Sequence, residues 1–185
     1  MAAEPEADAL LLRRYAQGDV AAFAELYARH EQRVWRYLQR NVRNRALAED
    51  LMQEVWFAVA RAAPQYQPSA RFTTWLFTIA HHRLLDALRR ERRQVSLEAL
   101  GIDADALPGS APEPPAVALA HEQGAALERA LATLPSEQRE AFLLHLEAEL
   151  TVEEIATLTG VGFETTKSRL RYARARLREL LSECA

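Results

Sequence analysis

The apolar residues of the chain recur at spacings of three and four over most of its length, which is the spacing of one face of an α-helix. The clearest stripe lies between Asp19 and Asn41, where it includes Phe23, Leu26 and Val34, and Asp19 can cap the first turn. The same pattern predicts further helices over residues 7–16, 46–63, 73–92, 119–133, 136–147, 152–159 and 164–183. The sequence therefore predicts an all-α fold.

One segment between these helices has a different character. Residues 94–116 contain four of the eight prolines and two glycines, and residues 95–125 carry five acids and neither Lys nor Arg. This composition favours an extended chain over a packed helix. We therefore expect two small helical domains, residues 8–94 and 119–183, joined by a flexible acidic linker over residues 95–118.

The composition also limits the location and the chemistry of the protein. No apolar stretch is long enough to cross a bilayer, and the segment Met1–Leu12 lacks the basic flank of a signal peptide. The single cysteine, Cys184, cannot form an internal disulfide or supply a zinc site by itself. We expect a cytoplasmic protein with no membrane insertion, no metal and no cofactor.

The net charge of −3 conceals a strong segregation of charge. Six Arg lie between Arg71 and Arg93, and one Lys and five Arg lie between Glu164 and Arg178. The planar guanidinium of Arg suits bidentate contacts with phosphate and guanine, so both islands favour nucleic-acid binding. The alternative is that the preference for Arg reflects only a GC-rich genome.

The second basic island follows a predicted helix-turn-helix. Thr151 and Glu154 have the spacing of a capping box, Gly160 can end a short helix in the left-handed conformation, and a basic helix begins about four residues later. Projection of this second helix buries Thr166 and Leu170 and turns a polar face outward.

The outward face of this helix is the candidate for reading duplex DNA. Residues near the start of such a helix reach base edges, while flanking basic residues contact phosphates. We assign Thr165, Ser168 and Arg171 to bases, and Lys167, Arg169 and Arg174 mainly to the DNA backbone. The alternative is an ordinary surface helix with solvated arginines.

The first basic island combines aromatic and basic residues on one helix face. The members of this stripe lie three or four residues apart and are Trp75, Thr78, His82, Asp86, Arg89 and Arg93. An aromatic ring before a row of cationic side chains suits an unstacked base and its phosphates. The alternative is that Trp75 and the neighbouring Phe72 are core residues.

The residues that could support catalysis do not form a known motif. Glu49, Asp50 and Glu54 are close in sequence, but no His lies at ligand spacing from them, and the adjacent His81 and His82 point to different faces. Neither a phosphate-binding loop nor a nucleophile motif is present. The acids form either a solvated face or a protein-docking face, and we expect no enzymatic activity.

Several of these segments together resemble one family. The segments 47–55 (LAEDLMQEV), 70–76 (ARFTTWL) and 86–90 (DALRR) resemble region 2 of the extracytoplasmic-function (ECF) sigma factors of the sigma-70 family. The segments 134–144 (LPSEQREAFLL), 150–156 (LTVEEIA) and 167–170 (KSRL) resemble region 4. The resemblance covers residues 8–94 and 119–183 and leaves the linker unmatched.

The resemblance implies a function and a role for each surface. Such a protein directs bacterial RNA polymerase core to specific promoters and assists promoter melting. Asp50, Gln53 and Glu54 would dock on the clamp helices of the largest polymerase subunit, and region 4 would contact the flap. The helix face with Phe72, Trp75, Thr78, His82, Arg89 and Arg93 would bind the minus-ten element, and the helix from Glu164 the minus-thirty-five element. An anti-sigma factor is an expected partner.

Four positions depart from the family pattern. Thr166 replaces a usual Val, Gly162 replaces a usual Ser or Thr cap, and His81-His82 replaces a commoner Arg/Asn pair.

The first alternative function is that of a stand-alone helix-turn-helix regulator, which would bind a palindrome without polymerase. A helical enzyme would need the acids and histidines to meet in one site.

Overall fold

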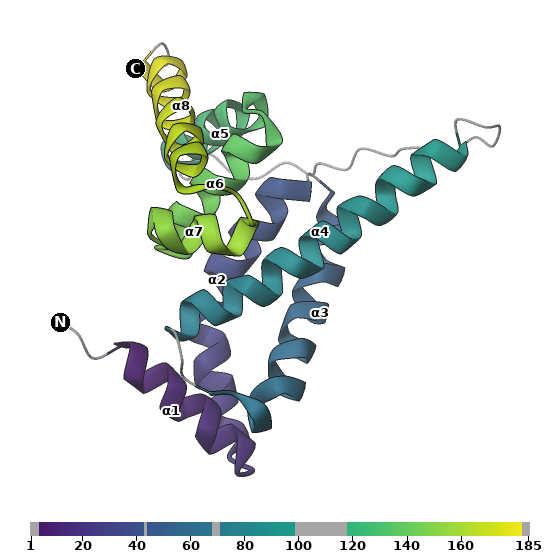
Figure 1. Cartoon of the computed structure of the whole chain (residues 1–185), viewed down its shortest axis with the longest axis vertical. Helices are drawn as coiled ribbons and strands as arrows, with labels where there is room; N and C mark the ends of the chain where they lie inside the picture. The colour runs from purple at the N-terminus through teal and green to yellow at the C-terminus, as the bar shows by residue number, and fades with distance from the viewer. Residues whose placement is uncertain (1–3, 43, 68–70, 99–117, 183–185) are drawn as a thin grey trace.

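The computed structural model describes residues 4–42, 44–67, 71–98 and 118–182, and the regular structure of these residues is helical throughout (Figure 1). The predicted all-α fold is therefore confirmed. The first group of helices is α1 (Glu4–Ala16), α2 (Val20–Val42), α3 (Arg45–Ala62), the 3-10 helix η1 (Ala63–Gln65) and α4 (Phe72–Glu98). The second group is α5 (Ala118–Thr133), α6 (Ser136–Glu147), α7 (Val152–Thr159) and α8 (Phe163–Ser182).

The N-terminal unit is built around α2, which packs against α1, α3 and α4. Its start is fixed by Asp19, whose carboxylate accepts a hydrogen bond from the backbone N–H of Ala22 at 3.2 Å. The Asn44 side chain caps α3 by accepting from the N–H of Leu47. Tyr37 of α2 is fully buried with its ring edge-on to Phe77 of α4, so the core of this unit forms where α2 and α4 cross.

The C-terminal unit is centred on α8, against which α5, α6 and α7 all pack. The side of α8 that faces these helices is the one that the sequence predicts, since Thr166, Leu170, Ala173 and Leu177 are buried. Leu143 and Leu144 of α6 and Ile155 of α7 complete this part of the core.

The two units lie against each other through α6 and α2 (Figure 1). Buried apolar residues from both units form one continuous cluster, so the structure is a closed arrangement. Helix α4 runs to Glu98, and the helical chain therefore includes residues 95–98, which the sequence assigned to the linker. Those residues contain neither Pro nor Gly, so nothing in them stops the helix. Residues 99–117, the rest of the predicted linker before Ala118, lie outside the described ranges.

None of the helices in the described ranges combines the length and the hydrophobicity that crossing a lipid bilayer takes.

A buried carboxylate ties α1 to α2. The Asp8 side chain is 5% exposed; one oxygen accepts from the Arg29 guanidinium at 2.9 Å and the other lies 2.7 Å from Nε2 of His30. Burial acts to raise the pKa of Asp8, but hydrogen bonds and charge from His30 and Arg29 outweigh it and lower the pKa below the ordinary value of 3.8. The charged form of Asp8 therefore stabilises the contact of the two helices.

Replacing Asp8 by Asn is expected to lower the free energy of unfolding by about 2 kcal/mol at neutral pH, because it leaves buried partners without their anion. Since the folded pKa is depressed, this contribution is present above the ordinary carboxyl pKa of 3.8 and disappears as the pH falls through the lower, folded value. Urea unfolding between pH 7 and pH 3 measures both effects. The same substitution at the exposed Asp50 serves as the control and should leave stability within about 0.5 kcal/mol.

Candidate nucleic-acid interface

The helix-turn-helix has the geometry that its sequence predicts. The Thr151 hydroxyl accepts from the N–H of Glu154 at 3.2 Å, and the Glu154 carboxylate accepts from the N–H of Thr151 at 2.8 Å, so the capping box at the start of α7 is complete. Gly160 ends α7 with φ 67°, in the left-handed region that favours glycine. Helix α8 then begins at Phe163, one residue before the predicted start.

The outward face of α8 carries the six residues that the sequence assigns to DNA. Thr165, Lys167, Arg171 and Arg174 are exposed, and Ser168 and Arg169 are partly buried. Among the nearby acids, Glu164 lies 3.7 Å from the Lys167 ammonium, an exposed contact that contributes little. The face is therefore cationic and accessible in the closed arrangement.

Two exposed aromatic residues add to this face and are absent from the sequence-based assignment. Phe163 is 41% exposed at the first turn of α8, and Tyr172 is 54% exposed two turns later. The Arg171 guanidinium lies 4.9 Å from the centre of the Tyr172 ring and donates to its hydroxyl at 3.1 Å. Tyr172 thus orients one of the predicted base-reading side chains. The sequence signal that could have identified Tyr172 is its position on the polar face of the helical projection.

The stripe on α4 divides between surface and core. His82, Arg89 and Arg93 are exposed, and Thr78 is partly buried with its hydroxyl donating to the backbone oxygen of Thr74. Phe72, by contrast, is 1% exposed. It therefore lies in the core, as the alternative interpretation of the sequence held, and it has no surface to offer to DNA in this arrangement.

The side chain of Trp75 is neither fully exposed like His82 nor fully buried like Phe72. It is partly buried, with its ring 4.8 Å from that of Tyr66 and 5.7 Å from that of Phe72. The sequence left its role open between core packing and base stacking, and a partly buried ring packs against Tyr66 and Phe72 while part of its surface stays exposed. Tyr66, which the sequence analysis did not single out, supports the ring from η1's C-terminal end.

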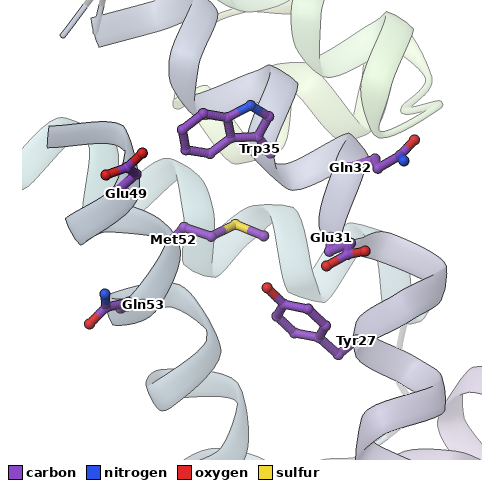
Figure 2. Close-up of a pocket in the computed structure, with 7 residues that line it drawn as sticks. All are labelled: Tyr27, Glu31, Gln32, Trp35, Glu49, Met52 and Gln53. Carbon is purple, nitrogen blue, oxygen red and sulfur yellow. The ribbon is translucent and has the colours of Figure 1, made fainter. Parts of the chain in front are cut away.

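The acidic helix α3 borders a shallow apolar hollow. Asp50 and Gln53 are exposed and Glu54 is partly buried, 3.8 Å from the Arg90 guanidinium. Beside them, Met52 lies between Tyr27 and Trp35 of α2 (Figure 2). The hollow encloses about 420 Å³. The polar residues that complete its lining are Glu31, Gln32, Glu49 and Gln53. An apolar floor with an acidic rim suits a protein helix that presents apolar and basic side chains.

The acids of α3 that the sequence offers for catalysis do not pair with His81 or His82. His81 is buried 3.0 Å from Glu140, His82 is exposed, and Glu49 pairs with Arg45 on its own helix. Within the described ranges, no group of three or more His, Cys, Asp or Glu side chains could hold a metal ion. Among the described residues, the acids and the two histidines that this alternative requires are therefore not joined in one metal-binding group.

The comparisons with known proteins match both halves of the chain. The family model Sigma-70 region 2 matches residues 26–94, and Sigma-70, region 4 matches residues 124–177. RNA polymerase sigma factor CarQ of Myxococcus xanthus is 37% identical over 93% of this chain and 96% of its own length. ECF RNA polymerase sigma factor RpoE of Cereibacter sphaeroides is 37% identical over 89% of this chain and 88% of its own. The chain belongs to the ECF sigma factors of the sigma-70 family.

An ECF sigma factor directs RNA polymerase to promoters for the initiation of transcription, and this is the function of the chain. The fold agrees with the family. The sigma factor RpoE of Bartonella quintana, solved in complex with the anti-sigma factor NepR, superposes with a TM-score of 0.68 over 86% of this chain and 96% of that one, at 24% identity.

Proposed function

We propose that the sigma factor divides the promoter between its two basic helices, and that units of residues 8–94 and 119–183 act as separate promoter-reading modules. The observation that carries this proposal is the cationic outward face of α8 behind a capped helix and a left-handed glycine turn. Helix α8 enters the major groove at the minus-thirty-five element. Thr165, Ser168 and Arg171 read base edges there, and the three basic residues that hold phosphates are Lys167, Arg169 and Arg174.

The stripe on α4 takes the minus-ten element as its strands separate. Trp75 stacks with a base turned out of the non-template strand, Thr78 and His82 line its path, and Arg89 and Arg93 hold phosphates. Selective binding of the separated strand shifts the equilibrium of the DNA towards the open form. Phe72 has a different role from the one that the sequence suggested, because it supports Trp75 from the core.

Asp50, Gln53 and Glu54 form the docking face for the clamp helices of the polymerase, with the hollow of Tyr27, Trp35 and Met52 beside them. Region 4 contacts the flap. The polymerase performs the chemistry, so the sigma factor has no catalytic activity of its own and acts in the cytoplasm, where the polymerase works. The Bartonella quintana relative binds an anti-sigma factor, and we propose that an anti-sigma factor also controls this chain.

Run-off transcription with purified core polymerase on fragments of the native genome tests the proposal. We expect defined transcripts that appear only when the sigma factor is present. A stand-alone regulator would instead bind a palindromic duplex tightly without core polymerase in a gel-shift assay. Binding of that kind, together with no transcript above the level of core alone on any fragment, would contradict the proposed function.

The substitution Trp75→Ala is expected to reduce open-complex formation about tenfold, because base–aromatic stacking contributes about 1–3 kcal/mol per base. Permanganate reactivity of unpaired thymines at a promoter found by run-off transcription measures the effect. Binding to core polymerase should stay unchanged. If the thermal transition of the variant collapses instead, Trp75 is a core residue and its assignment to DNA is wrong.

A further inference from the structure

Phe163 is an exposed apolar side chain at the end of α8 where a helix-turn-helix meets base pairs. It is the first residue of α8 and follows the left-handed turn at Gly160. The backbone N–H of Thr166 donates to the Gly162 oxygen at 3.0 Å, so the first helical turn forms at this point. Residues at the N-terminal end of the second helix are the ones that contact base edges in this motif. Phe163 therefore lies at the DNA-reading end of the helix.

The surroundings of Phe163 leave its ring accessible. The side chain is 41% exposed, and its neighbours Gly162, Glu164 and Thr165 are exposed as well. In the described part of the chain, a Cβ atom at Gly162 would meet nothing within 4 Å beyond its own chain neighbours. The start of the helix is therefore uncrowded on this side, and a base pair has room to approach the ring.

A cation on the next turn of α8 lies over this ring. The Lys167 ammonium is 5.8 Å from the centre of the Phe163 ring and 3.7 Å from the Glu164 carboxylate. A cation near the face of an aromatic ring is attracted by the π electrons of the ring. Because Lys167 is one of the proposed phosphate contacts, its binding to the DNA backbone brings the Phe163 ring next to the base pairs of the same stretch of groove.

The chemistry of the phenyl ring restricts what it can recognise. The ring has neither a donor nor an acceptor for hydrogen bonds, whereas the Tyr172 hydroxyl further along α8 accepts from Arg171 at 3.1 Å. The base pairs present donors and acceptors in the major groove, and thymine adds an apolar group, its C5-methyl. Apolar side chains such as Phe recognise thymine by packing on that methyl. Phe163 is therefore matched to the thymine of an A·T pair.

We infer that Phe163 is a specificity-determining residue that packs on the C5-methyl of a thymine in the minus-thirty-five element. This inference rests on the proposed function of α8, and it adds one base contact to those assigned to Thr165, Ser168 and Arg171. It requires an A·T pair at one fixed position of that element in the promoters of this sigma factor. Uracil lacks only the methyl group of thymine, so replacing that thymine by uracil removes the contact and keeps the base pair.

Uracil scanning of a promoter bound by the sigma factor–polymerase complex tests the contact. The probe is a labelled fragment of a promoter found by run-off transcription, in which each thymine of the minus-thirty-five element, in either strand, is replaced in turn. Fluorescence anisotropy should show that one replacement weakens binding about fourfold, which is the contribution of one buried methyl-sized group. Cytosine at that position, paired with guanine, should also weaken binding, and 5-methylcytosine should restore part of the loss because it carries the methyl.

Variants at position 163 then connect the methyl to this ring. Phe163→Ala should bind the unmodified fragment about fourfold more weakly and lose the discrimination between thymine and uracil, because the ring and the methyl form one contact. Phe163→Leu keeps an apolar side chain and should retain part of the discrimination. The matched control Leu10→Ala removes an apolar side chain of α1 that is 56% exposed, and it should keep the full preference for thymine.

The outcomes separate the inference from the function on which it rests. The inference is overturned if no uracil in the minus-thirty-five element weakens binding, or if uracil weakens the binding of Phe163→Ala as much as that of the parent. It is also overturned if Phe163→Ala binds core polymerase more weakly without DNA, because the ring then contacts protein. If the parent protein with core polymerase yields no run-off transcript, the proposed function fails instead. Uracil scanning of the parent needs no substitution, so misfolding of a variant cannot hide a negative result.

Discussion

The variant Asp50→Arg with Glu54→Arg is expected to bind core RNA polymerase about a hundredfold more weakly than the parent protein. Both acids lie on α3 beside the hollow floored by Tyr27, Trp35 and Met52. Removal of one partner of a buried interfacial charge pair costs about 2–5 kcal/mol, and reversal adds repulsion. The ion pair between Glu54 and Arg90 is long, at 3.8 Å, so it contributes little to the stability of the fold.

Biolayer interferometry with immobilised core polymerase, in the absence of DNA, measures this affinity directly. Because Asp50 is exposed and Glu54 is only partly buried, the free energy of unfolding should change by about 0.5 kcal/mol or less. Glu179→Arg, the same reversal on an exposed acid of α8, is the control and should bind normally. If the affinity of the double variant stays within threefold of that of the parent, the assignment of α3 to the docking face is wrong.

Local chemistry made the helices predictable from the sequence. Thr151 and Gly160 fix the ends of α7 through hydrogen bonds and backbone conformation that depend on a few neighbouring residues. The same reasoning placed the start of α3 one residue late, since Asn44 is the cap and the helix begins at Arg45. The C-terminal end of α4 has no such signal, and α4 extends to Glu98, beyond the predicted end at residue 92, because neither Pro nor Gly precedes it there.

The division of a helix face between core and surface was harder to predict. Phe72 and Trp75 belong to the same aromatic segment, yet Phe72 is fully buried between His30, Tyr66 and Trp75. Helical spacing gives the direction of a side chain but not the element that lies opposite. On α3, Trp56 is buried because Phe23 and Tyr27 of α2 pack against it.

The closed arrangement could not be predicted from the pattern of the sequence. Arg36 and Glu147 are 111 residues apart, and each occurs among charged residues that are typical of a solvated helix face. Their pairing depends on how α6 docks on α2, which is decided by the packing of both cores and not by either segment alone. The candidate DNA face of α8 was predictable for the opposite reason, since its role requires only one amphipathic helix and its preceding turn.

Replacing Lys167, Arg169 and Arg174 together by Ala is expected to lower the affinity of the sigma factor–polymerase complex for a promoter duplex about a hundredfold at about 0.15 M salt. Each phosphate contact that is lost removes about 0.9 from the slope of log affinity against log salt concentration, so three contacts flatten the slope by about 2.7. Ala is a good helix former, and Lys167 and Arg174 are exposed, so α8 should remain folded.

Fluorescence anisotropy of a labelled promoter fragment at several salt concentrations separates this effect from base recognition. The loss should be nearly uniform over promoter sequences, whereas Arg171→Ala should relax the preference at one base pair and cost about 1–3 kcal/mol there. Arg176→Ala is the control, because Arg176 pairs with Glu179 at 2.7 Å near the far end of α8. An unchanged salt slope in the triple variant would mean that these three cations face solvent, and that α8 does not hold the phosphates of the minus-thirty-five element.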